Sequence, residues 1–95
     1  MLNETKTRTG QDFYDRYYYK YNEIGINAKK IVSIGEEFTF ARNTKIIISI
    51  DNSMVYEFIA RPDDEYLESV AQEAVEGTFY FFKELEKQSK YFIQY

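Results

Sequence analysis

Two neighbouring strand-forming runs constrain the fold of this chain most. Residues 45–50, KIIISI, are β-branched and almost continuously apolar, which is expected of a central strand. Residues 54–60, MVYEFIA, alternate between apolar and polar side chains, which is typical of a strand with one buried face. Residues 51–53, Asp-Asn-Ser, favour a tight turn because Asp and Asn tolerate a left-handed backbone. The pattern therefore predicts an antiparallel hairpin in the middle of the chain.

Two shorter apolar runs precede this hairpin. Residues 30–34 and 37–41 both have strand character, and Phe38 and Phe40 share one face of the second run. Gly35-Glu36 is a turn signal between them, and residues 42–44 turn the chain again. We therefore predict an antiparallel meander of three or four strands.

The segment before the meander has a helical pattern. Thr9 is a suitable N-cap and Gly25 a suitable left-handed C-cap, with Ile26 as the apolar contact beyond it. We predict a helix over residues 10–24. A strand is the alternative, because tyrosines in this segment also alternate. The apolar stripe of the helix consists of Phe13, Tyr17, Tyr21 and Ile24.

A second helix is predicted after the meander, over residues 63–90. Pro62 ends the last strand, and the acids that follow suit the positive end of a helix dipole. At 1.5 Å per residue this helix is about 42 Å long. It therefore either breaks at Gly77 or projects beyond the domain. Its apolar and small positions are Leu67, Val70, Ala71, Ala74, Thr78, Phe81, Leu85 and Phe92.

The chain is expected to form one small domain over residues 1–95, with residues 1–8 frayed. The predicted fold class is α+β. An antiparallel meander of three to four strands is flanked by an N-terminal helix and a long C-terminal helix, in the order α-β-β-β-α.

The residues that most catalytic sites need are missing. The chain has no histidine and no cysteine, which removes the commonest general base, the commonest transition-metal ligand and any thiolate nucleophile. Phosphate-binding glycine motifs are absent as well. Acids at the start of the second helix could bind Mg²⁺ or Ca²⁺, but a solvated first helical turn is the preferred interpretation. We predict no catalytic residue, no cofactor, no metal site and no enzymatic activity.

Acidic residues are concentrated in one span. The chain has a net charge of −4, yet residues 51–76 carry eight acids and Arg61 as their one basic residue. A row of carboxylates can imitate the phosphates of DNA and occupy a basic groove. The alternative is a surface that only keeps the protein soluble. The predicted protein-binding acids are Asp51, Glu57, Asp63, Asp64, Glu65, Glu68, Glu73 and Glu76.

The six aromatic rings of residues 12–21, DFYDRYYYKY, have three interpretations. The helical stripe places most of them in the core. Tyr19 lies off that stripe and is predicted to contact a protein, because tyrosine offers a large amphipathic surface at low entropic cost. Arg16 and Lys20 interleave with the rings, as in proteins that stack nucleic-acid bases. Direct binding to nucleic acid is the least favoured interpretation, because the chain is acidic.

A second aromatic cluster occupies residues 79–82, FYFF. Four consecutive rings cover every side of a helix, so some must face outward or meet a partner. A homodimer through Phe79, Phe81 and Phe82 is therefore expected in the alternative hypothesis, a structural or adaptor protein that self-associates.

In composition and element order, the chain resembles small phage-encoded inhibitors of host nucleic-acid enzymes, such as anti-CRISPR proteins. The likeness rests on size, on missing His and Cys, and on the acidic span. It implies an inhibitor that blocks a host nucleic-acid-handling protein in the host cytoplasm. No apolar run approaches 18 residues, so no contact with a membrane is expected.

Overall fold

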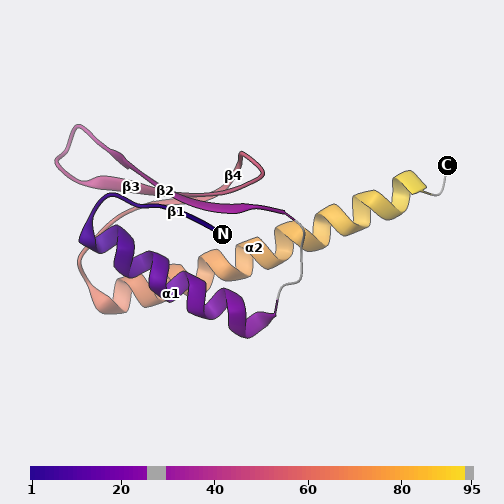
Figure 1. Ribbon diagram of the computed structural model, residues 1–95, viewed down its shortest axis with the longest axis horizontal. Coiled ribbons are helices and arrows are strands. Elements are labelled where there is room, and N and C mark those ends of the chain that lie inside the picture. The colour runs from indigo at the N-terminus through magenta and orange to yellow at the C-terminus, as the bar shows by residue number, and fades with distance from the viewer. Residues whose placement is uncertain (26–29, 94–95) are drawn as a thin grey trace.

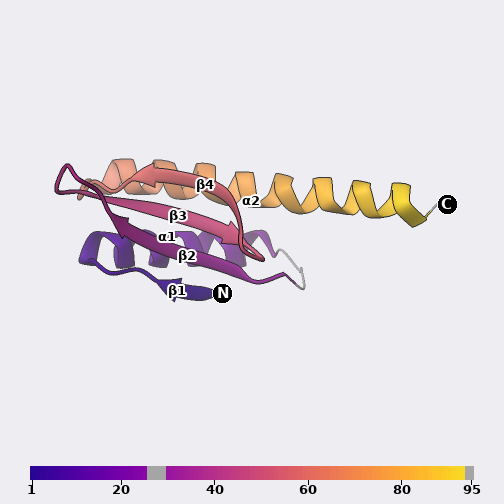
Figure 2. The same ribbon diagram turned by 90° about the horizontal axis from the view of Figure 1, so that it is seen from above.

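The computed structural model describes residues 1–25 and 30–93, and the side chains of residues 1–25 and 30–87. It contains one four-stranded sheet in the order β1-β2-β3-β4 and two helices that cover the same face of this sheet (Figures 1 and 2). No helix or strand among the described residues covers the opposite face of the sheet (Figure 2). The elements are β1 (Leu2–Glu4), α1 (Arg8–Ile24), β2 (Val32–Phe38), β3 (Thr44–Ile50), β4 (Ser53–Ile59) and α2 (Asp64–Ile93).

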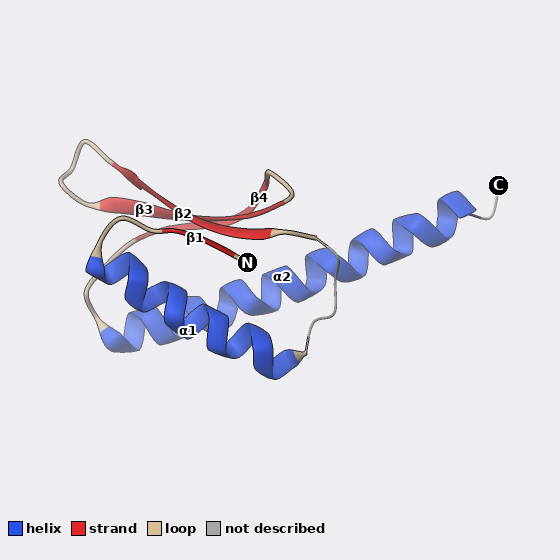
Figure 3. Cartoon of the chain, in the orientation of Figure 1, coloured by secondary structure: helices blue, strands red, loops and turns tan. Residues whose placement is uncertain are grey.

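The predicted α+β class is confirmed, with a meander between an N-terminal and a long C-terminal helix (Figure 3). One strand was missing from the prediction. Leu2–Glu4, inside the segment expected to be frayed, forms β1 and pairs in parallel with Ser33–Gly35. The sheet is therefore mixed rather than purely antiparallel. The three residues of β1 are all exposed, so no alternation of apolar and polar residues indicates this strand in the sequence.

The meander differs from the prediction in one place. Gly35 and Glu36 do not turn the chain, because β2 runs unbroken through them and pairs with β3 along its whole length. Glu36 is a buried residue of this strand. The turn predicted at residues 42–44 is present between β2 and β3 but occupies residues 39–43. The predicted turn after residue 50 is confirmed, since Asp51 and Asn52 have φ values of 49° and 71°.

The core lies between the sheet and the two helices. Alternate residues of β3 are buried, as expected for a strand with one covered face. On α1, Phe13 and Tyr17 are fully buried, and the Tyr17 hydroxyl lies 2.6 Å from the Thr78 hydroxyl of α2. The buried apolar residues are Phe13, Tyr17, Val32, Ile34, Ile46, Ile48, Ile50, Leu67, Val70, Ala71, Ala74, Val75 and Phe82.

Helix α1 begins two residues before its predicted start. Thr7, and not Thr9, is the N-cap, and its hydroxyl accepts a hydrogen bond of 3.0 Å from the Gly10 amide. Gly25 ends the helix in the left-handed conformation, as predicted, with φ 70°. The predicted apolar contact of Ile26 lies outside the described residues.

Helix α2 continues through Gly77 without a break. It has 30 residues against 17 in α1, which makes it about 20 Å longer. Its C-terminal part therefore projects beyond the sheet and beyond α1 (Figure 1). Neither described helix combines the length and the apolar character needed to cross a membrane.

Candidate functional site

The turn between β2 and β3 forms the most exposed apolar feature of the described chain. We define the hairpin tip as residues 38–43. The Thr39 amide donates a hydrogen bond of 3.0 Å to the Asn43 carbonyl, and the Thr39 hydroxyl also contacts the Asn43 side chain. Arg42 takes a left-handed conformation with φ 61°. These hydrogen bonds close the turn between the two strands.

Two phenylalanines extend from this hairpin tip into solvent. Phe38 is 72% exposed and Phe40 is 111% exposed. A hollow of about 340 Å³ lies between these rings, with Glu37, Thr39 and Lys45 as its other lining residues. Burial of an aromatic ring from a rigid position contributes strongly to protein–protein affinity. The hairpin tip is therefore the best candidate for a protein contact.

Cationic side chains accompany the exposed rings. The Lys6 ammonium lies 5.7 Å from the centroid of the Phe38 ring, within the range of a cation–π interaction. Arg42 is exposed at the turn itself, and no ion pair within the described residues involves either cation. The hairpin tip thus combines apolar surface with positive charge.

Glu36 holds Lys6 and the rest of the N-terminal segment beside the hairpin tip. One oxygen of its carboxylate accepts hydrogen bonds from the amides of Lys6 (2.7 Å) and Thr7 (2.9 Å). The other oxygen accepts from the hydroxyls of Thr7 (2.6 Å) and Thr44. Burial alone would raise the pKa of Glu36, but the hydrogen bonds from Thr44, Thr7 and Lys6 outweigh burial and lower that pKa.

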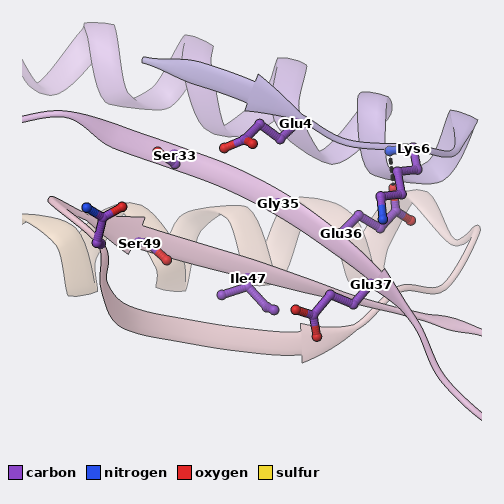
Figure 4. A pocket seen from close by; sticks show the side chains of 9 residues that line it. Glu4, Lys6, Ser33, Gly35, Glu36, Glu37, Ile47 and Ser49 are labelled. Atoms are coloured by element: carbon purple, nitrogen blue, oxygen red, sulfur yellow. Dashed lines mark hydrogen bonds between the residues drawn. The ribbon is translucent and has the colours of Figure 1, made fainter.

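A second, polar hollow lies on the uncovered face of the sheet (Figure 4). Its volume is about 390 Å³. Small side chains on β2 and β3 form its floor, namely Ser33, Gly35 and Ser49, and the carboxylates of Glu4 and Glu37 lie at its border. Within residues 1–25 and 30–87 no group of three or more potential ligands could hold a metal ion. The hollow offers room for side chains of a partner.

The eight predicted acids are all exposed, but most contact other groups of the same chain. Arg16 of α1 binds Asp64 and Glu68 of α2 at 3.0 and 3.1 Å, and Lys20 binds Glu68 at 2.9 Å. These ion pairs join the two helices. The salt bridges with Arg16 and Lys20 lower the pKa of Glu68, with the hydrogen bond from Lys20 as the largest cause.

The remaining acids are dispersed over the molecule. In the β3–β4 turn, Asp51 pairs with Lys30 at 3.3 Å, and on the open face Glu57 pairs with Lys45 at 3.4 Å. Asp63 accepts from the Tyr66 amide and caps α2, and Glu73 accepts from the Tyr56 hydroxyl. Glu76 accepts from Gln72, and Glu65 is exposed. The structure therefore does not gather the acids into one row.

Of the aromatic residues predicted to contact partners, some are exposed and others are buried. Tyr19 is 66% exposed on α1. On α2, Phe82 is 8% exposed and belongs to the core, and Phe81 packs against that core. Phe82 therefore cannot contact a second chain while this core is intact. Tyr80, which the prediction omitted, is 67% exposed, and Phe79 is half-buried beneath the Lys83 ammonium.

Comparison with known proteins relates the chain to one family. A family model described as "Curli assembly protein CsgE" matches residues 1–92. No curated protein and no solved structure matches the chain significantly. The match thus covers β1, both helices and the hairpin tip.

This match overturns the inhibitor hypothesis. The chain is related to proteins of curli assembly, so the predictions of a phage-encoded or viral, anti-CRISPR-like inhibitor and of a DNA-mimicking surface are wrong. A host nucleic-acid enzyme as partner and the host cytoplasm as location are wrong for the same reason. The match favours the alternative hypothesis of a structural or adaptor protein. In the sequence, acids that form ion pairs within the chain look the same as acids that form a binding surface.

Proposed function

Because this chain belongs to the CsgE family of curli assembly proteins, we propose that it is a non-catalytic adaptor of curli secretion and assembly. The match to residues 1–92 is the observation that carries this proposal. We further propose that residues 1–95 act as one small domain and that the domain works in the bacterial periplasm. The chain lacks cysteine, so its fold requires no disulfide in any compartment.

We propose that the hairpin tip is the surface through which the adaptor contacts the curli assembly machinery. Three properties support this assignment. Phe40 is completely exposed, the turn around it is held by hydrogen bonds, and Lys6 and Arg42 add positive charge. An aromatic anchor on a rigid loop binds with little loss of conformational entropy. Positive charge beside it would accelerate association with an acidic partner surface.

The test is complementation in a curli-forming bacterium from which its own CsgE-family protein has been deleted. The chain is expressed in the periplasm, and extracellular curli are measured. Phe40→Ser should abolish curli formation, because it removes the anchor without touching the core. Tyr18→Ser is the matched control, because Tyr18 is an exposed ring of α1 for which no contact is proposed. Full activity of Phe40→Ser, at equal protein level, would refute the hairpin tip as the contact surface.

A second proposal is that copies of the chain self-associate through the exposed side of α2. The observation in its favour is that α2 extends about 20 Å beyond the length of α1, with Tyr80 exposed on it. Tyr80 is thus an exposed aromatic ring that the described chain leaves uncovered. We propose Tyr80 and the half-buried Phe79 as contacts, in place of the buried Phe82.

Sedimentation equilibrium tests this second proposal. The wild-type chain should form a dimer or larger assembly at tens of micromolar, about the range in which a weak complex is populated. Tyr80→Glu should shift it toward the monomer, whereas Tyr18→Glu should not. A monomeric wild type throughout that range would rule out self-association by α2 and would leave the hairpin-tip proposal unaffected.

A further inference from the structure

Strand β4 lies at an edge of the sheet, and no described strand pairs with its outer side. Its sequence, SMVYEFI, is rich in β-branched and aromatic residues, with Glu57 as its one charged residue. None of its seven residues is buried, and Met54 and Ile59 are 58% and 38% exposed. Such an exposed edge is a template on which another extended chain can pair.

The backbone of β4 is irregular in the middle of this edge. Ile48 of β3 pairs with Tyr56, but the next residue, Ser49, pairs with Met54. Val55 is therefore an extra residue without a partner on β3, which makes it a β-bulge. A bulge bends the strand and increases its twist, so an incoming straight strand can match only part of the edge.

Tyr66 of α2 closes the other part of the edge. The Ala60 amide donates to the Thr44 carbonyl at 2.8 Å, so the backbone groups of Ala60 point toward β3. Those of the preceding residue, Ile59, consequently point outward. The outward carbonyl of Ile59 accepts a hydrogen bond of 2.7 Å from the Tyr66 hydroxyl. Tyr66 thus occupies the position that a pairing strand would need.

The Tyr66 ring is held in this position from two sides. It packs edge-on against Phe58, with 6.0 Å between the ring centroids and 66° between the planes. The Arg61 guanidinium lies 4.9 Å from the centroid of the Tyr66 ring, within the range of a cation–π interaction. The Glu57 side chain adds a negative charge on β4, where it pairs with Lys45. Charges on an edge strand oppose intermolecular pairing.

We propose that Tyr66, together with the bulge at Val55 and the charge of Glu57, closes the β4 edge to the addition of another strand. The excluded partner is any extended polypeptide strand, including the β4 edge of a second copy. The other edge of the sheet is protected differently, because β1 has only three residues and very short edge strands offer few pairing groups. An edge closed in this way keeps the folded chain from adding to another sheet.

The test measures whether the purified chain polymerises when these protections are removed. Wild type, Tyr66→Phe, and Tyr66→Phe combined with Glu57→Thr are incubated with shaking at the same concentration. Thioflavin T fluorescence and the soluble fraction are followed over time. Tyr66→Phe keeps the ring and its packing, so circular dichroism should show the wild-type fold at the start. We expect a gain of thioflavin T fluorescence and a loss of soluble protein in Tyr66→Phe, with a larger effect in the double variant.

Tyr18→Phe is the matched control, because it removes a hydroxyl from an exposed tyrosine of α1 for which no contact is proposed. It should remain soluble like the wild type. The proposal is overturned if the folded Tyr66→Phe and double variants stay as soluble as the wild type, or if the wild type polymerises as fast as they do. Should the double variant not fold, Tyr66→Phe alone decides. The assay contains no partner, so its failure would leave the adaptor function untouched.

Discussion

Replacement of Gly10 by alanine is expected to destabilise the fold, although alanine is the better helix former. Gly10 lies in the first turn of α1 and is buried. A Cβ atom built on Gly10 would lie 2.8 Å from Glu36 Cδ, closer still to Glu36 Oε1, and 3.1 Å from Thr5 Cβ. The end of a glutamate side chain would normally move away. Here four hydrogen bonds from Lys6, Thr7 and Thr44 hold it in place.

The size of the effect follows from two opposing contributions. Overpacking of a filled site costs about 1–3 kcal/mol, and replacing a helical glycine by alanine returns about 0.5–1 kcal/mol. The net loss should be about 1–2 kcal/mol in the free energy of unfolding, which lowers the melting temperature by about 5–15 °C for a domain of this size. Thermal and urea unfolding followed by circular dichroism measure this loss.

Gly77→Ala is the matched control for this experiment. Gly77 is also a helical glycine, but no atom lies within 4 Å of a Cβ built on it. The same substitution should therefore stabilise the chain there by about 0.5–1 kcal/mol. Opposite signs at the two glycines are the expected result. If Gly10→Ala is as stable as the wild type or more stable, the rigid carboxylate of Glu36 is not the constraint that we describe.

Two further predictions concern buried polar groups. Because the pKa of Glu36 is lowered below its ordinary value of 4.5, its carboxylate stabilises the fold above that pH, and the contribution is lost as the pH falls through the folded pKa. Glu36→Gln should therefore cost about 1–3 kcal/mol at pH 7, and urea unfolding should show a smaller cost at pH 3. Burial raises the pKa of Tyr17 to about 12 from 10, so stability should decline as the pH rises from 10 to 12. Tyr17→Phe should lower the free energy of unfolding by about 1 kcal/mol at pH 7, since the Thr78 hydroxyl loses a partner. Unfolding experiments on this variant should also show a smaller loss of stability between pH 10 and 12 than the wild type shows.

Regular hydrophobic patterns made most of the fold predictable. The β-branched run of β3 and the three- and four-residue steps of α2 each reflect one buried face. The alternation of β4 reflects half-buried residues such as Tyr56 and Phe58 that pack against the core. The element that escaped prediction, β1, has no buried residue. It is held by pairing with β2 and by the contacts of Glu36, and both involve residues about thirty positions away. Local sequence carries no sign of either contact.

The candidate site was harder to predict than the fold, because exposure depends on where the chain turns. Phe38 and Phe40 alternate as in a strand with one buried face, but the strand predicted over residues 37–41 ends at Phe38, and the turn predicted at residues 42–44 begins at residue 39. This shift moves Phe40 from a strand into the hairpin tip. The Arg42-Asn43 pair was a usable signal, since Arg42 takes a left-handed conformation there. The acids were predicted to be free for a partner, but several pair within the chain. The ion pairs of Arg16 and Lys20 with acids of α2 depend on the packing of the two helices, which the sequence does not show.

The contacts that stabilise this chain and the surfaces that we assign to partners are separate in space. Tyr17, Thr78 and the core residues lie between the sheet and the helices, whereas Phe40, Tyr80 and the β4 edge lie outside that layer. Glu36 is the exception, because its hydrogen bonds both stabilise the fold and position Lys6 beside Phe38. Substitutions at Phe40 or Tyr80 should therefore change binding at nearly constant stability, within about 0.5 kcal/mol. Glu36→Gln should change stability and binding together, and this coupling separates a residue that supports the hairpin tip from one that forms it.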